Sequence, residues 1–203
     1  MLALSRRFNE VREANTRSKF SYEHLRGFDL KDKTLGIVGT GRIGLRVAHI
    51  ALAFGMKVIA YEPCKQSLMA EIVGLQYVPL DELLSRSHVI SLHTPLTPET
   101  FHMLDEKALG KMRRGVVLIN TARGALVDTV ALIEALNGGI VAGAGLDVLE
   151  EESVMRKDAM KIITERIVTR LQTTSSEEFS VKNPERIWHI NAIMFYSAEM
   201  EKD

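Results

Sequence analysis

The sequence has little of several features that mark other classes of protein. It holds one cysteine, Cys64, in 203 residues, which excludes an intramolecular disulfide framework and fits a reducing cytoplasm. No apolar run approaches the roughly 18 residues of a membrane-spanning helix, and the N-terminal residues lack the apolar core of a secretory signal. Lys plus Arg and Asp plus Glu each number 26, so no net charge attracts nucleic acid or an anionic membrane. We therefore expect a cytoplasmic protein with no membrane or nucleic-acid partner, and we assign no metal ligands.

Apolar residues are plentiful, at 46% of the chain, and their spacing changes in a regular way. Short apolar runs alternate with longer segments of helical periodicity, and this alternation predicts a parallel, doubly wound α/β sheet with helices on both faces. The expected strands are Leu35–Val38, Val58–Tyr61, Gln76–Val78, His88–Leu92, Val116–Asn120 and Val141–Leu146, and the expected helices are 42–55, 65–73, 80–86, 105–113 and 128–137.

Segments of a different character flank this alternating region. Leu2, Leu4, Phe8 and Val11 form a partial helical stripe near the N-terminus, and a polar stretch follows it. Beyond residue 152 we expect two helical segments, 154–171 and 184–200, and no confident strand. The predicted division is an N-terminal helix and linker over 1–30, a cofactor-binding domain over 31–152 and a helical tail over 153–203.

A glycine motif lies where the first strand gives way to the first helix. The spacing Gly39-x-Gly41-x-x-Gly44 is typical of a turn that places a pyrophosphate on a helix N-terminus, where free amides and the helix dipole favour an anion. Gly39 is expected to make the tight turn, Gly41 to let the backbone approach the phosphates, and Gly44 to let the helix pack on the strand. The motif predicts a dinucleotide-binding site.

Glu62 directly follows the second predicted strand, 18 residues beyond Gly44. This is close to the spacing expected of the acid that accepts hydrogen bonds from the adenosine ribose. A carboxylate there repels a 2′-phosphate, so we expect NAD to be preferred to NADP. The competing interpretation is a solvated glutamate at a strand end.

Ligands of open α/β sheets bind beyond the carboxyl ends of the strands, so residues just after the later strands are further candidates. Arg123 follows the fifth strand, and its planar guanidinium suits a carboxylate, although a surface ion pair explains it as well. Asp147 follows the last strand, but the acidic residues after it are typical of a solvated helix start. His93 follows the fourth strand, and we expect it to be structural rather than a catalytic base.

Four sequence segments together resemble those of a known family. In order and spacing they resemble the NAD-binding domain of the D-isomer-specific 2-hydroxyacid dehydrogenases, over roughly residues 1–152. Within that family their sequences are most similar to the D-lactate dehydrogenase type. The resemblance implies a Rossmann-type domain, NAD as cofactor and a small 2-keto or 2-hydroxy acid as substrate. The four segments are Leu35-Gly-Ile-Val-Gly-Thr-Gly-Arg-Ile-Gly44, His93-Thr-Pro-Leu-Thr-Pro-Glu-Thr100, Leu118-Ile-Asn-Thr-Ala-Arg-Gly124 and Gly145-Leu-Asp-Val-Leu-Glu150.

The resemblance also implies a role for individual cofactor-site residues. The backbone amides of Arg42 and Ile43 bind the pyrophosphate, and Glu62 binds the adenosine ribose. The adenosine half also meets Thr94, Pro95 and Thr100.

At the other end of the cofactor, the resemblance places Thr121 and Asp147 beside the nicotinamide, Asp147 binding its carboxamide. Arg123 binds the substrate carboxylate and polarises the C2 oxygen. Glu152 is the acid that pairs with the family's catalytic histidine and raises its pKa, because a nearby anion favours imidazolium. That histidine supplies the proton when hydride arrives from the nicotinamide.

The sequence departs from the family in two ways. The first portion of the substrate domain has no counterpart, and the catalytic histidine, normally in a Pro-His pair after a short apolar strand, is not found. His189 has neither the strand nor the proline before it, so we do not assign it that role. We expect a truncated dehydrogenase in which cofactor binding is better supported than turnover.

Two other functions remain open from the sequence. One is a non-catalytic NAD-binding regulatory or scaffolding module of the kind found in corepressors that resemble this family. The other is the NAD domain of an adenosylhomocysteinase-like enzyme, which Asn120-Thr-Ala-Arg123 disfavours. Because the family's cofactor domains pair and the stripe from Leu2 to Val11 favours burial, we also expect a homodimer.

Overall fold

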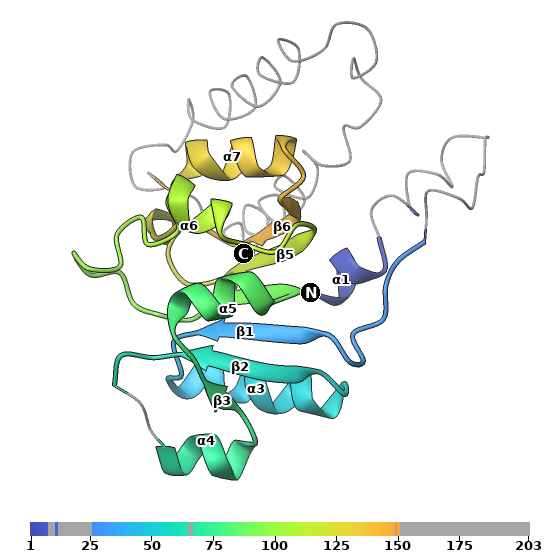
Figure 1. Ribbon diagram of the computed structural model, residues 1–203, viewed down its shortest axis with the longest axis vertical. Helices are drawn as coiled ribbons and strands as arrows, with labels where there is room; N and C mark the ends of the chain where they lie inside the picture. Colours follow the sequence, from blue (N-terminus) through green and yellow to red (C-terminus); the bar gives the residue numbers. More distant parts are fainter. Residues whose placement is uncertain (8–10, 12–25, 65–66, 149, 151–203) are drawn as a thin grey trace, which may run out of the picture.

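A computed structural model gives the fold and describes residues 1–7, 11, 26–64, 67–148 and 150. Six parallel strands form one sheet in the order β3-β2-β1-β4-β5-β6 (Figure 1). Two strands, β2 and β3, extend to one side of β1 in chain order, and the chain then returns to place β4, β5 and β6 on its other side. The strands are β1 (Thr34–Val38), β2 (Lys57–Tyr61), β3 (Gln76–Tyr77), β4 (Val89–Leu92), β5 (Val116–Asn120) and β6 (Val141–Leu146).

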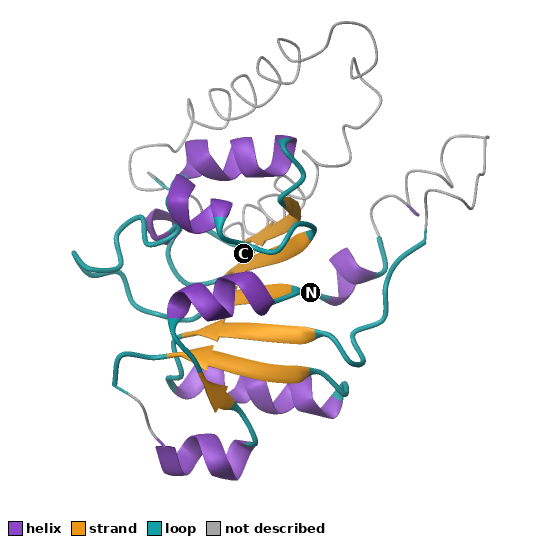
Figure 2. Cartoon of the chain, in the orientation of Figure 1, coloured by secondary structure: helices purple, strands orange, loops and turns teal. Residues whose placement is uncertain are grey.

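Helices connect the strands and cover both faces of the sheet (Figure 2). Side chains of α5, α6 and α7 pack into the cluster on one face, and those of α3 and α4 into the cluster on the other. The predicted doubly wound α/β fold is therefore confirmed. The helices are α1 (Leu2–Ser5), α3 (Arg42–Ala53), α4 (Ser67–Val73), α5 (Leu80–Arg86), α6 (Glu106–Gly110), α7 (Thr129–Asn137) and the 3-10 helix η1 (Gly124–Leu126).

The strands are apolar on both faces because both faces are covered. Along β1, Leu35 and Ile37 contribute to the cluster under α3, and Val38 contributes to the cluster under α5. Each is at most 1% exposed, and burying a side chain of this size stabilises the fold by about 1.5–3 kcal/mol. This core holds the carboxyl ends of the strands at one edge of the sheet.

The structure shortens or shifts some of the predicted elements. The helix expected over 105–113 is the shorter α6, which ends at Gly110. Asp105 precedes it as its N-terminal cap, because its side chain accepts a hydrogen bond from the Ala108 amide at 2.8 Å. Asp128 likewise precedes α7 as its cap, accepting from Val130 and Ala131. The 3-10 helix η1 was not predicted, because three residues show no periodicity.

The N-terminal stripe is only partly exposed. Leu2 is 49% exposed, but Leu4 lies over the glycines of β6, where a Cβ on Gly143 would stand 3.6 Å from its Cδ2 atom. Phe8 and the predicted helices of 154–171 and 184–200 lie outside the described residues. Among the helices that the structure describes, none is long and apolar enough to cross a bilayer.

Candidate functional site

The turn between β1 and α3 presents free backbone amides at the centre of the sheet. Gly39 has φ +94°, a conformation that side chains rarely adopt, and Gly41 precedes α3 as a cap without a side chain. The first turn of α3 contains no acidic residue, and no described side chain caps the helix, which leaves the first amides, including those of Arg42 and Ile43, available to a ligand. An uncapped helix start of this kind attracts an anion.

The three glycines of the motif differ in what surrounds them. A Cβ on Gly44 would lie 2.1 Å from the carbonyl oxygen of Gly39, so only glycine allows α3 to pack this closely on β1. A Cβ on Gly39 would lie 2.7 Å from the backbone nitrogen of Thr94, so the β4 exit passes directly against the turn. Apart from Gly41 and its two chain neighbours, no atom of the described residues lies within 4 Å of a Cβ placed on Gly41. Space for a ligand therefore lies at Gly41, while the other two glycines are packed against protein.

Glu62 lies at the end of β2 and contacts the glycine turn. Its Oε2 accepts a hydrogen bond from the backbone nitrogen of Thr40 at 2.9 Å and lies 3.4 Å from the Thr40 hydroxyl. That hydroxyl also contacts the hydroxyl of Tyr77 at 2.9 Å. Among the described residues, Glu62 Oε1 has no hydrogen-bond partner, so it can accept from a ribose hydroxyl. Glu62 is thus held in place rather than solvated at random.

Hydrogen bonds of side-chain hydroxyl groups fix the loop that follows β4. Thr100 donates to the carbonyl of Pro95 at 2.8 Å and accepts from the Thr97 amide at 2.7 Å, which closes the loop. His93 Nε2 lies 2.9 Å from the Ser91 hydroxyl, and burial lowers the pKa of His93 from its ordinary value. A partly buried imidazole that contacts the Ser91 hydroxyl of the preceding strand fits the structural role expected for His93.

The loop after β5 is shaped by Asn120. Its side chain accepts from the Ala122 amide at 3.0 Å and donates to the Arg123 carbonyl at 2.9 Å, which folds the backbone so that Arg123 precedes η1. The side chains of Thr121 and Arg123 are exposed. Arg123 Nη1 donates to the Ala122 carbonyl at 2.7 Å, so one arm of the guanidinium is turned onto its own backbone.

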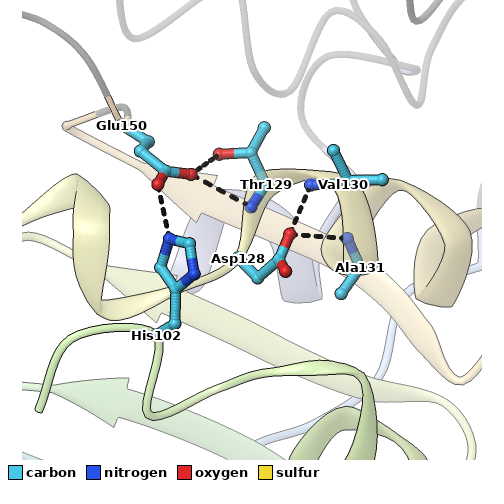
Figure 3. A network of polar contacts seen from close by, with 6 residues as sticks. All are labelled: His102, Asp128, Thr129, Val130, Ala131 and Glu150. Carbon is cyan, nitrogen blue, oxygen red and sulfur yellow. Dashed lines mark hydrogen bonds and ion pairs between the residues drawn. The ribbon is translucent and has the colours of Figure 1, made fainter.

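The exit of β6 brings the acidic residues to the same edge. The Asp147 amide donates to the Asn120 carbonyl at 3.0 Å, and the Asp147 side chain is exposed. Glu150 contacts His102 and Thr129 (Figure 3), so the expectation of a solvated acidic run is wrong for this residue. In the sequence, Glu150 is only one of several neighbouring acidic residues, and nothing there indicates its contacts. Glu152 lies outside the described residues.

The described candidates therefore meet at one edge of the sheet. Gly39 lies beside Thr94 across β1 and β4, and Asp147 lies beside Asn120 across β5 and β6. The fold and this edge define a dinucleotide-binding domain of the Rossmann type, since ligands of such sheets bind at the switch point between β1 and β4.

Comparison with known proteins identifies the family. The D-isomer specific 2-hydroxyacid dehydrogenase family, NAD binding domain, matches residues 1–171, and the chain belongs to this family. Over 136 residues it is 52% identical to a glyoxylate reductase from Thermococcus litoralis, covering 67% of this chain and 41% of that protein.

Solved structures agree with this assignment. The apo-structure of D-lactate dehydrogenase from Escherichia coli matches with a TM-score of 0.70 and 42% identity, covering 78% of this chain and 50% of that one. A D-lactate dehydrogenase from Aquifex aeolicus, complexed with NAD and lactic acid, matches with a TM-score of 0.74 and 37% identity over 100% of this chain and 64% of that one. The chain spans about half the length of the curated relatives it matches.

Proposed function

We propose that this chain binds NAD(H) across the β1 and β4 carboxyl ends and serves the interconversion of 2-keto acids and D-2-hydroxy acids. The observation that carries the proposal is the open, uncapped start of α3 at Gly41, where, in the part of the chain that the structure describes, only the chain neighbours of Gly41 lie within 4 Å of the Cβ position. The Arg42 and Ile43 amides hold the pyrophosphate, and Glu62 accepts from the adenosine ribose. Thr94, Pro95 and Thr100 border the adenosine half.

The nicotinamide end of the site lies toward β5 and β6. Thr121 and Asp147 meet the nicotinamide, and the exposed Arg123 binds the carboxylate of a small 2-keto or 2-hydroxy acid. Bound NADH supplies the hydride of keto-acid reduction. Glu152 would raise the pKa of a histidine that protonates the C2 oxygen.

NAD(H) is expected to bind at least about tenfold more tightly than NADP(H), because Glu62 repels a 2′-phosphate where the adenosine ribose lies. Glu62→Gln is expected to reduce this preference, since the charge is lost while the side chain keeps its length. Titration by nicotinamide fluorescence with NADH and NADPH measures both affinities.

Tyr77→Phe is the matched control. It removes the hydroxyl that contacts Thr40 but leaves the Glu62 carboxylate in place, so the preference is expected to persist. Equal or tighter binding of NADPH by the unmodified chain contradicts the assignment of Glu62.

We propose that the domain forms a homodimer through the surface near α1. Leu2 is 49% exposed there, and burying such a residue in a second copy is favourable. Sedimentation at micromolar concentration is expected to show a dimer that Leu2→Lys weakens. Ile72→Lys is the control, since Ile72 is also exposed, at 69%, but lies on α4. A monomer, or a dimer that only Ile72→Lys disrupts, contradicts this interface.

We also propose the reducing cytoplasm as the compartment. The support is Cys64, the single cysteine of the sequence, which is exposed and carries a free thiol.

A further inference from the structure

The carboxylate of Glu150 joins three segments that are far apart in the sequence (Figure 3). One oxygen, Oε1, accepts a hydrogen bond from Nε2 of His102, which lies in the loop between β4 and α6. The other, Oε2, lies 3.0 Å from the Thr129 hydroxyl and 3.4 Å from the Thr129 amide. The His102 and Glu150 side chains are only 28% and 23% exposed. These contacts are therefore partly shielded from water, which strengthens them relative to surface pairs.

The charge of Glu150 matches its surroundings. Thr129 is the first residue of α7, and Asp128 already accepts the Val130 and Ala131 amides at 2.9 and 3.0 Å. Glu150 adds a second carboxylate at this positive helix end, where an anion is stabilised. An ionised carboxylate only accepts hydrogen bonds, so Nε2 of His102 carries the proton.

His102 is itself fixed to the β5 side of the site. Its backbone has φ +48°, and its amide donates to the Ala125 carbonyl of η1 at 2.8 Å. Leu104 pairs with Val127 in an isolated parallel bridge, which ties the same loop to the residue after η1. The loop that begins at Thr94 and the loop that carries Arg123 thus form one unit, and Glu150 attaches the β6 exit to it.

Asp147 and Glu150 are therefore each held by hydrogen bonds. The Asp147 amide is bonded to the Asn120 carbonyl at 3.0 Å, and three residues later Glu150 is bonded to His102 and Thr129. Three residue steps span at most about 11 Å, so fixing Glu150 restricts the position of Asp147.

We propose that Glu150, with His102 and Thr129, is a positioning residue that aims Asp147 at the nicotinamide end of the cofactor. This inference rests on the proposed NAD(H) site. Glu150 acts through Asp147 and does not itself contact the cofactor. Its loss is expected to weaken recognition of the nicotinamide while recognition of the pyrophosphate and adenosine stays intact, since those depend on the β1–α3 turn and on Glu62.

The test compares two ligands that share every group except the nicotinamide. Binding of NADH and of ADP-ribose is measured by calorimetry for the full chain and for Glu150→Ala, after circular dichroism has shown that the variant is folded. Glu150→Ala is expected to raise the Kd of NADH by about three- to tenfold, the size of coupling usual within one hydrogen-bond network, and to change that of ADP-ribose by less than about twofold. Glu71→Ala, an exposed glutamate on α4, is expected to change neither.

Two matched variants of His102 test the same contact at its histidine partner. They also provide the test if Glu150→Ala does not fold. His102→Gln keeps a donor near the position of Nε2, whereas His102→Asn tolerates the positive φ but has too short a side chain to reach Glu150. Asn is expected to reproduce the selective loss of NADH affinity and Gln to restore it.

Three results overturn the inference while the proposed function stands. The first is that the affinities for NADH and ADP-ribose weaken by the same factor, as a general loss of structure produces. The second is that neither affinity changes, and the third is that the Gln and Asn variants at position 102 behave alike. If the unmodified chain binds neither ligand, the proposed function itself fails.

Discussion

Gly44→Ala is expected to lower the free energy of unfolding by about 3 kcal/mol, whereas Gly41→Ala is expected to lower it by less than about 1 kcal/mol and instead to weaken NADH binding at least about tenfold. A methyl group on Gly44 would lie 2.1 Å from the carbonyl oxygen of Gly39, and neither backbone segment can yield without separating α3 from β1. Beyond its chain neighbours, a methyl group on Gly41 meets no atom of the described residues within 4 Å, and the backbone there has φ −67°, which alanine adopts readily. That methyl group occupies the space proposed for the pyrophosphate.

Thermal unfolding and NADH titration of the two variants separate these effects. Ala53→Gly on α3 is a useful reference, because it alters the same helix by one methyl group at an exposed position away from the turn. Loss of stability in Gly41→Ala, or unchanged NADH affinity in that variant, contradicts the proposal that the open space at Gly41 is a ligand site.

The fold was predictable because its signals are local. Each strand is a short apolar run and each turn has its own chemistry, so the alternation alone indicates a parallel sheet. Even β6 was found, although Gly143 and Gly145 weaken a strand. The structure explains these glycines, since the side chain of Leu4 lies over both.

The glycine turn shows which structural features the spacing of a sequence motif can predict. The motif predicted which glycine makes the turn and which one packs against the strand, because such a crossing has few solutions. It did not predict that Glu62 accepts from the amide of Thr40, or that Tyr77 contacts the same threonine. These contacts depend on how β1, β2 and β3 are arranged, which spacing within one segment does not encode.

The Glu150 contact was missed for the same physical reason. Glu150 lies 48 residues from His102 along the chain, and no local pattern joins them. In the sequence it is one acid among several, and only the parallel order of β4, β5 and β6 brings it to the loop that carries His102. Polar contacts between strand exits are set by the tertiary structure.

The 203-residue chain is expected to bind NADH but to reduce 2-keto acids at least about 10²-fold more slowly than a full-length relative, because general acid catalysis commonly contributes 10²–10⁴-fold. Reduction leaves an alkoxide that needs a proton, and the sequence contains no Pro-His pair of the kind that carries the family's acid. Arg123 is exposed and, with one arm of its guanidinium bonded to the Ala122 carbonyl, can bind a carboxylate but cannot supply that proton.

Oxidation of NADH with pyruvate, glyoxylate and hydroxypyruvate measures this, with a full-length relative as the positive control. NADH binding with slow or undetectable turnover agrees with the expectation, and any slow residual rate is then compared with that of Arg123→Ala to separate an impaired enzyme from a regulatory NAD-binding module. In an impaired enzyme the residual rate falls further when Arg123 is replaced, because substrate binding is lost, whereas a module has no rate to lose. Robust turnover that Arg123→Ala abolishes refutes the expectation and makes His189 the first residue to replace, since another group must then deliver the proton to the C2 oxygen.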